Sequence, residues 1–178
     1  METLTEYEKI SIAFWVRSRF LVSRAGDSLI LEEETVDPFF KDYDIDDHPL
    51  SWPLRFDTSN WVVFAAFDGD RRIGGAVAAW KTPELGLLGS REDLVSLWDL
   101  RVDPAHRHSG VGYRLFEAVV IWARERQCVE LVIETQDINV PACRFYVRQG
   151  CELRFANKDA YPPEMNEIQL LWYRKLDV

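Results

Sequence analysis

Leu97-Trp-Asp-Leu-Arg-Val-Asp-Pro-Ala-His-Arg-His-Ser-Gly-Val-Gly-Tyr-Arg114 is the stretch that decides the fold of this chain. Its apolar start predicts a buried strand, Asp103-Pro104 ends that strand, and Gly110 and Gly112 open an amphipathic helix. A strand, a tight loop and a helix in this order aim backbone N–H groups and the positive end of the helix at one point, where glycine lets a ligand approach the main chain. The stretch therefore predicts an anion site, most simply for a phosphate.

The charge around this loop differs from the charge of the whole chain, whose net value is −9. Five basic residues surround the predicted anion site: Arg101, His106, Arg107, His108 and Arg114. The electrostatic potential around the loop is therefore expected to be positive, although the chain as a whole is negative. Two glycines alone are also common in ordinary turns. The two common phosphate-binding loops do not match this sequence. A P-loop would need Gly-Lys-Ser/Thr, and a dinucleotide-binding loop would need a third glycine and an acidic residue that binds the ribose. The pattern that fits is Arg107-x-x-Gly110-x-Gly112.

Length and composition predict one globular domain over residues 1–178, because 47% of the residues are hydrophobic and 29% are charged. Asp and Glu number 30, against 21 Lys and Arg. This excess argues against nucleic acid or an anionic membrane as the partner and favours a cationic small molecule or a basic peptide. The seven tryptophans permit an aromatic interface such as that of a homodimer.

The cysteines and the N-terminus predict a cytoplasmic protein with reduced thiols. Cys128, Cys143 and Cys151 are odd in number and lack zinc-ligand spacing, so no metal site is expected. The N-terminus has neither a basic region nor a long apolar run, and no stretch reaches the length of a membrane-spanning helix.

Hydrophobic periodicity and turn residues predict a mixed series of strands and helices. Alternation predicts a strand from Ile10 to Arg17, which is followed by a turn at 25–27 and a return strand at 28–32. A hairpin is expected from 60–67 and 73–80, a loop from 83 to 90, a helix from Gly112 to about Arg126 and a strand at 129–135. A helix is expected between Asn139 and Gly150, with Ala142, Phe145, Tyr146 and Gln149 on one face. Residues 151–155, a loop through 161–163 and a strand at 167–176 complete the chain. The crossover from 97–102 to 129–135 predicts that these two strands are parallel.

Residues 37–57 mix three prolines with aspartates and aromatic residues, and this mixture predicts an ordered acidic loop. Four aspartates stand close together in it: Asp42, Asp44, Asp46 and Asp47. They are either a solvated charge run or a lip that attracts an ammonium group.

Two blocks of sequence resemble the GNAT family of acetyl-CoA-dependent N-acetyltransferases. The first is the Arg107-x-x-Gly110-x-Gly112 loop, and the second is Glu134-Thr-Gln-Asp-Ile-Asn-Val-Pro-Ala-Cys-Arg-Phe-Tyr146, followed by Gly150. The second block is similar in particular to the streptothricin acetyltransferase branch. The resemblance covers residues 60 to the C-terminus. It implies a mixed α/β fold with a largely antiparallel sheet, in which two central parallel strands splay apart to hold acetyl-CoA.

The resemblance also implies roles for residues of the two blocks. The main chain around Leu100 and Val102 pairs with the pantetheine arm, the amides of residues 107–113 hold the pyrophosphate, Asn139 meets the pantetheine, and Tyr146 protonates the departing thiolate. The implied cofactor-binding residues are Leu100, Arg101, Val102, Arg107, His108, Ser109, Gly110, Val111, Gly112, Tyr113, Asn139, Cys143 and Tyr146. His108-Ser109 stands where the family often has Gly-Lys, Asp137 replaces a frequent Asn, and residues 1–55 lack the pattern of two helices that many members show.

Two carboxylates are candidates for the general base, because Asp99 and Glu134 lie on the two strands that line the expected cleft. The alternatives are a salt bridge to a neighbouring Arg for Asp99 and a capping interaction with the following loop for Glu134. Cys143 has no basic residue placed to lower its pKa, so we interpret it as a small core residue rather than as a nucleophile.

Together these features predict transfer of an acetyl group from acetyl-CoA to a primary amine of a cationic small molecule, by direct attack in a ternary complex. A streptothricin-type antibiotic is the best named candidate, which would make the protein a resistance enzyme. A polyamine, another aminated metabolite or a protein amine is the alternative acceptor. A non-catalytic acetyl-CoA-binding sensor is the alternative of another class.

Overall fold

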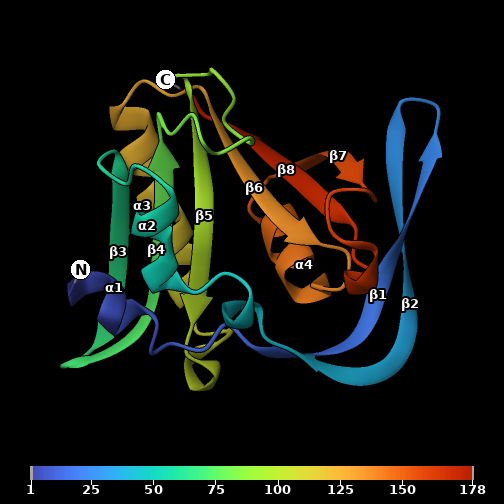
Figure 1. Ribbon diagram of the computed structural model, residues 1–178, viewed down its shortest axis with the longest axis horizontal. Coiled ribbons are helices and arrows are strands. Elements are labelled where there is room, and N and C mark those ends of the chain that lie inside the picture. Colours follow the sequence, from blue (N-terminus) through green and yellow to red (C-terminus); the bar gives the residue numbers. More distant parts are fainter. Residues whose placement is uncertain (1, 178) are drawn as a thin grey trace. The chain divides into compact units, whose positions relative to one another are not determined.

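A computed structural model describes residues 2–177, which form helices and β-strands (Figure 1). The elements in chain order are α1 Glu2–Tyr7, β1 Phe14–Ala25, β2 Ser28–Lys41, η1 Tyr43–Ile45, η2 Pro49–Ser51, α2 Trp52–Arg55, β3 Trp61–Asp68, β4 Arg71–Trp80, β5 Leu94–Val102, η3 Pro104–His106, α3 Val111–Glu125, β6 Glu130–Gln136, α4 Val140–Arg148, β7 Glu152–Asn157, η4 Pro163–Met165 and β8 Gln169–Lys175. None of the helices described is long and apolar enough to cross a membrane.

The chain forms two compact units. Unit 1 comprises Met1–Ala13, Asp42–Val132 and Lys175–Val178, and unit 2 comprises Phe14–Lys41 and Ile133–Arg174. The division falls within β6. A single acetyltransferase domain over residues 1–178 stays a prediction.

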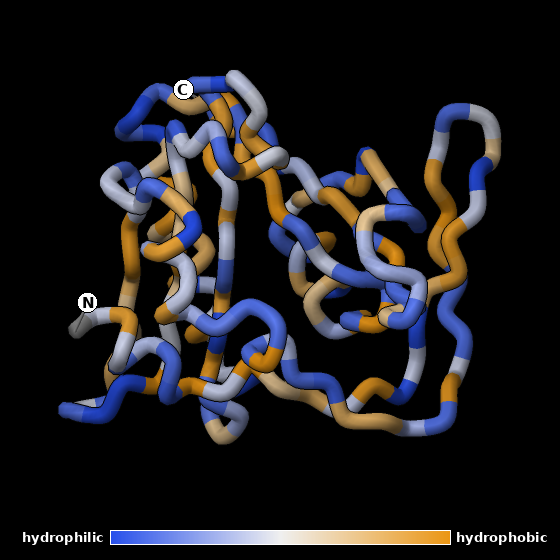
Figure 2. Tube along the Cα trace, viewed as in Figure 1, coloured by the Kyte–Doolittle hydropathy of each residue, from blue (hydrophilic) through white to orange (hydrophobic). Residues whose placement is uncertain are grey.

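Unit 1 is a sheet with a helix on one face and an aromatic cluster on the other. Its strands follow the order β3-β4-β5-β6, and the β3–β4 and β4–β5 pairs are antiparallel. Helix α3 packs against β3, β4 and β5 with a face of apolar residues at helical spacing. That face comprises Leu115, Phe116, Val119, Val120, Trp122 and Ala123. Figure 2 shows the hydrophobic residues along β3.

The aromatic cluster of unit 1 surrounds the buried Trp52. Its ring centroid lies 6.2 Å from that of Trp61 and 6.3 Å from that of Trp98, while Phe56 stacks on Trp61. Trp98 stands at a β-bulge, because the β4–β5 register passes from Val77↔Asp99 to Ala78↔Leu97 and leaves Trp98 as the extra residue. The bulge falls four residues before the end of β5.

Unit 2 combines the β1–β2 hairpin with α4 and the strands β6, β8 and β7. A two-stranded ribbon is marginally stable alone. Here Arg19 of β1 forms a salt bridge with the buried Asp137, and the Phe20 amide donates to the Asp137 carbonyl at 3.0 Å. Lys41 at the end of β2 pairs with Glu167 at 2.7 Å. These contacts anchor the hairpin to the rest of its unit.

The structure confirms the expected hairpin of β3 and β4, the β5–loop–α3 segment, β6, α4 and β8, with boundaries shifted by one to three residues, and it adds the strand β7, for which the sequence predicts no element. It also confirms a loop over residues 83–90. Asn139 is the N-cap of α4, Pro141 lies in its first turn, and Gly150 follows its end with φ +75°. The buried face of α4 differs from the expected one: Val140 and Cys143 are buried beside Tyr146, whereas Ala142, Phe145 and Gln149 are only partly buried.

For the first 57 residues, the predicted turn at 25–27 between two strands is confirmed in the β1–β2 hairpin, but the bounds of both strands and the expected acidic loop are wrong. Helix α1 was not expected, and the strand predicted from Ile10 begins only at Phe14, because Ile10 packs in the core outside any strand. The return strand continues to Lys41, and the rest of the expected acidic loop forms η1, η2 and α2. The prolines explain this outcome: Pro49 and Pro53 begin helical turns, where the missing N–H costs nothing, and Pro38 lies in β2, which pairs on one side only.

The close contact between β4 and α1 predicts a specific sensitivity at Gly75. A Cβ at this position would lie 2.6 Å from the Tyr7 ring and 2.8 Å from the Phe64 carbonyl oxygen. We expect Gly75→Ala to lower the free energy of unfolding by about 1–3 kcal/mol through overpacking, as measured by urea denaturation. Gly86→Ala is the control, because a Cβ there meets open space. Equal stability of the two variants would contradict the packing described.

Candidate functional site

The loop between β5 and α3 in unit 1 presents unpaired backbone N–H groups. Asp103 caps the turn η3 by accepting from the Ala105 amide, and the chain then passes through His108 at φ +63° and Gly110 at φ +86°. Gly110 is the N-cap of α3 and supplies no side-chain cap. The first amides of a helix have no acceptor within it, so those of Val111, Gly112 and Tyr113 remain free to bind an anion.

The basic residues of this loop do not gather as the sequence suggested. The expected contribution of the Arg101 side chain is wrong, because that side chain is buried in an ion cluster. Arg107 donates from Nε to the Val102 carbonyl at 3.2 Å and from Nη2 to the Ala13 carbonyl at 3.4 Å. His106 Nδ1 lies 3.5 Å from Asp103 Oδ1. His108 and Arg114 are exposed.

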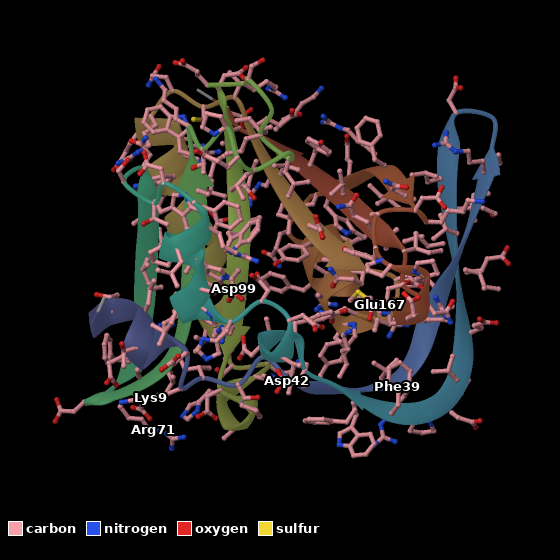
Figure 3. All side chains as sticks on the ribbon, in the orientation of Figure 1. Lys9, Phe39, Asp42, Arg71, Asp99 and Glu167 are labelled. Atoms are coloured by element: carbon pink, nitrogen blue, oxygen red, sulfur yellow. The ribbon has the colours of Figure 1, made fainter. Side chains whose placement is uncertain are left out.

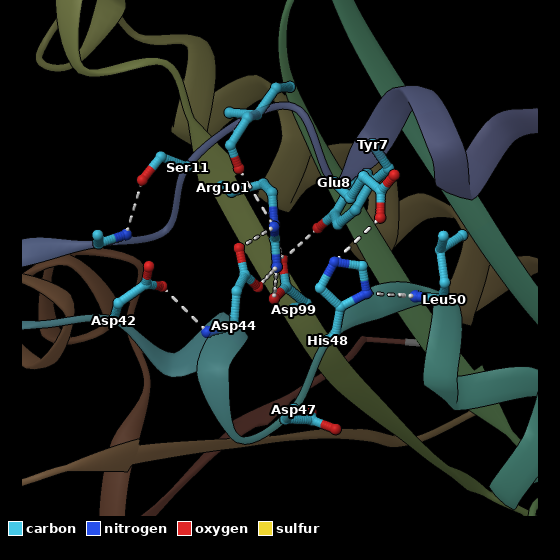
Figure 4. A network of polar contacts seen from close by, with 12 residues as sticks. Tyr7, Glu8, Ser11, Asp42, Asp44, Asp47, His48, Leu50, Asp99 and Arg101 are labelled. Atoms are coloured by element: carbon cyan, nitrogen blue, oxygen red, sulfur yellow. Dashed lines mark hydrogen bonds and ion pairs between the residues drawn. The ribbon is translucent and has the colours of Figure 1, made fainter.

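Arg101 is the centre of a buried ion cluster in unit 1 (Figure 4). Its guanidinium donates to Asp99 at 3.0 and 2.8 Å, to Asp44 at 3.1 and 3.0 Å, and to the Ile10 carbonyl at 3.1 Å. The Tyr7 hydroxyl also donates to Asp99. Burial opposes the charge of Arg101, but Asp99 and Asp44 outweigh it and raise the pKa of Arg101. Burial, together with the negative charge of Asp99, raises the pKa of Tyr7.

This cluster changes the interpretation of Asp99 as a general base. Both of its oxygens accept hydrogen bonds, and the Arg101 cation compensates its charge. The salt bridge to a neighbouring Arg, which the sequence left open as an alternative, is therefore present. Asp99 is therefore committed to partners within the protein, which argues against its use as the general base.

Three of the four clustered aspartates also have partners. Asp42 caps η1, Asp44 pairs with Arg101, and Asp47 pairs with Arg55. Burial raises the pKa of Asp44 and of Asp47, and the nearby arginines only partly offset this effect. Two of the four charges are thus compensated within the protein, which weakens the interpretation of the segment as a lip for ammonium groups.

Glu134, the second candidate base, lies in unit 2 among neutral donors. Tyr161 donates its hydroxyl to Glu134 Oε1 at 2.6 Å, and Gln169 donates from Nε2 to Glu134 Oε2 at 2.7 Å. Gln136 Nε2 donates in turn to the Tyr161 hydroxyl at 2.9 Å. Burial and the charge of Glu134 raise the pKa of Tyr161, so this tyrosine keeps its proton. The capping interaction considered for Glu134 is replaced by these side-chain contacts.

Helix α4 carries the other candidate residues of unit 2. Asn139 Oδ1 accepts from the Ala142 amide at 3.3 Å, which commits this oxygen to capping the helix. Cys143 is buried, with its sulfur 3.3 Å from Thr135 Oγ1, and burial raises the pKa of the thiol to about 12. A thiol with this pKa is protonated at neutral pH and is a poor nucleophile. Tyr146 is 7% exposed and its ring lies edge-on to Phe145.

Each unit therefore brings together part of the predicted site. Unit 1 holds Asp99, the end of β5 and the 107–113 loop, and unit 2 holds Glu134, Asn139, Cys143 and Tyr146. Sequence reasoning missed Tyr161, which lies 27 positions after its partner Glu134 and directly before two prolines in the loop between β7 and β8. No spacing rule joins such residues. Within residues 2–177, no group of three or more His, Cys, Asp or Glu residues is arranged to hold a metal ion.

Comparison with known proteins identifies relatives over most of the chain. A family model described as "Acetyltransferase (GNAT) family" matches residues 29–151. A streptothricin acetyltransferase of Escherichia coli is 29% identical over 163 residues, which are 90% of this chain and 84% of that protein. Streptothricin acetyltransferase A of Bacillus subtilis (strain 168) is 28% identical over 146 residues, which are 81% of this chain and 78% of that protein.

Solved structures share the fold. A nourseothricin acetyltransferase superposes with a TM-score of 0.76 at 25% identity, covering 99% of this chain and 94% of its own. A Bacillus anthracis str. Ames protein assigned as a streptothricin acetyltransferase, and crystallised with acetyl coenzyme A, superposes with a TM-score of 0.80 at 24% identity over 99% of this chain and 95% of its own. These matches confirm the predicted mixed α/β fold with a mostly antiparallel sheet.

The buried ion cluster predicts that Arg101 is critical for stability. Arg101→Met leaves Asp99 and Asp44 without their cation, so we expect the free energy of unfolding to fall by about 3–5 kcal/mol in urea denaturation at pH 7. Arg71→Met is the matched control, because Arg71 forms an exposed ion pair with Asp103, and we expect its stability to stay close to that of the wild type. Similar losses in both variants would refute the importance assigned to the cluster.

Proposed function

The chain belongs to the acetyltransferase (GNAT) family, and from this premise we propose that it acetylates a primary amine of a streptothricin-type cationic antibiotic. It is an acetyl-CoA-dependent N-acetyltransferase, with acetyl-CoA as its co-substrate. The relatives that support the choice of acceptor carry the name streptothricin acetyltransferase and match 90% and 81% of this chain. The net charge of −9 suits a cationic acceptor.

Within this chain, Glu134 carries the proposal. It is a half-buried carboxylate whose hydrogen bonds come only from the neutral groups of Tyr161 and Gln169. A partly desolvated charge needs a counter-charge. An acceptor ammonium group is a cation of the right sign, and Glu134 can then accept its proton. Asp99 lacks this property because Arg101 already compensates it.

The co-substrate would be held by the main chain of β5 and by the amides of the 107–113 loop. The free N–H groups at the start of α3 suit the pyrophosphate, since a helix N-terminus favours anions. The end of β5 at Leu100 and Val102 would pair with the pantetheine arm. The family resemblance also implies that Asn139 and Cys143 bind the co-substrate.

The reaction needs a neutral amine, a polarised thioester and a stabilised thiolate. Glu134 takes a proton from the acceptor R–NH3⁺ and leaves R–NH2. Bound acetyl-CoA supplies the thioester carbonyl that this amine attacks, so that the N–C bond forms and the C–S bond breaks. Tyr146 donates its proton to the departing sulfur and regains one from the acylated nitrogen. The balance is R–NH3⁺ and acetyl-CoA to R–NH-acetyl, CoA–SH and H⁺.

Other acceptors and another class of function would use the same features. A polyamine, an aminated metabolite or a protein amine would also satisfy Glu134. A non-catalytic sensor would keep the anion loop and bind a partner protein, but it would not need Tyr146. Turnover without a partner protein separates an enzyme from a sensor.

The decisive experiment is acetyl-CoA-dependent thiol release with streptothricin, spermidine, lysine and a basic peptide. We expect turnover on streptothricin, with kcat lowered about 100-fold in Tyr146→Phe because the acid is removed. Tyr173→Phe is the control for loss of a tyrosine hydroxyl in unit 2. Turnover only on another amine would show that this amine, and not streptothricin, is the acceptor. Binding of acetyl-CoA without turnover on any amine would favour the sensor.

A further inference from the structure

Tyr161 contacts the proposed base from a loop that no predicted role includes. The loop joins β7 to β8, and Tyr161 precedes Pro162, which restricts it to extended conformations. Its hydroxyl stands between two side chains of β6, donating to Glu134 at 2.6 Å and accepting from Gln136 at 2.9 Å. The hydroxyl thus has a fixed orientation, since its one proton points to Glu134.

The other buried carboxylates of unit 2 have different partners. Asp137 pairs with Arg19, and Glu167, which Figure 3 labels, pairs with Lys41 at 2.7 Å. Within the part of the chain that the structure describes, Glu134 has no such cation and accepts one neutral donor on each oxygen. The protein therefore orients this carboxylate without compensating its charge. The negative charge of Glu134 can therefore be compensated by a cationic ligand.

We propose that Tyr161 is a positioning residue for acetyl transfer, which holds the Glu134 carboxylate in one rotamer so that it receives the acceptor ammonium group. This inference rests on the proposed function and deepens it. Tyr161 transfers no proton itself: its hydroxyl stays protonated and keeps donating while Glu134 gains and loses the substrate proton. Gln136 fixes the tyrosine, and Gln169 fixes the second oxygen of Glu134.

The hydrogen bond from Tyr161 to Glu134 predicts that the pH dependence of the reaction shifts when Tyr161 is replaced. A hydrogen bond to a carboxylate stabilises its ionised form, so removing the bond favours the protonated form. Glu167 is the other charge that acts on Tyr161, and Lys41 pairs with it. With Tyr161→Phe, the acidic limb of the kcat/KM profile should therefore move to higher pH.

The experiment compares pH profiles of wild type, Tyr161→Phe, Glu134→Gln and the control Tyr173→Phe, with the amine that the wild type acetylates. We expect Tyr161→Phe to lower kcat about tenfold, as loss of one hydrogen bond to a charged group does, and to move the acidic limb upward. Glu134→Gln should remove the limb, and Tyr173→Phe should leave it in place. Gln136→Leu, which frees the tyrosine without removing its hydroxyl, should show a smaller shift in the same direction.

The outcomes separate the inference from the proposed function. A wild-type profile in Tyr161→Phe, with the limb lost in Glu134→Gln, would overturn the positioning role alone. A wild-type profile in Glu134→Gln would overturn the assignment of the base and the positioning role together, as would absence of turnover by the wild type on every amine. A lower rate with an unmoved limb would show that Tyr161 is merely structural.

Discussion

The buried charge of Arg101 is the constraint on which unit 1 depends. A guanidinium cannot stay ionised in a core without partners, and here Asp99 of the same strand, Asp44 of η1 and the Ile10 carbonyl supply them. These partners come from three separate segments, so the N-terminal segment and the turn after β2 cannot leave β5 without exposing an unpaired charge. The cluster thereby fixes the strand that carries the bulge at Trp98 and leads into the anion loop.

The same physical rule separates two carboxylates that look alike in the sequence. The Arg101 cation compensates the charge of Asp99, whereas Glu134 accepts hydrogen bonds from a hydroxyl and an amide, which are neutral and do not compensate its charge. Hydrogen bonds from neutral donors orient a carboxylate and keep it ionised, but they do not satisfy it as a counter-ion does. The difference between these environments, rather than the presence of an acidic residue on a strand, is the reason for proposing Glu134 and not Asp99 as the base.

Local patterns predicted most of the fold because they act over a few residues. The β5–loop–α3 segment follows from an apolar run, a proline and two glycines, and Asn139 caps α4 as its residue type favours. Alternation along β5 also places Asp99 and Arg101 on one face, which favours a salt bridge between them. This pattern predicts the position of the Arg101 side chain better than its closeness in sequence to the loop does. The contacts of Tyr7 and Tyr161, in contrast, join residues 92 and 27 positions from their partners, and no local pattern encodes them.

The loop before α3 binds its anion mainly through the main chain if the proposed function holds. Arg101 is committed to its cluster and Arg107 to two carbonyls, while His108 and Ser109 stand where the family pattern often has Gly-Lys. His108 adopts φ +63°, a conformation that costs a residue other than glycine about 1 kcal/mol or more. The fold retains this strain because the chain must turn there for Gly110 to start α3. Amides do not titrate, so a cradle of N–H groups lets an acidic protein hold an anionic co-substrate by geometry rather than by net charge.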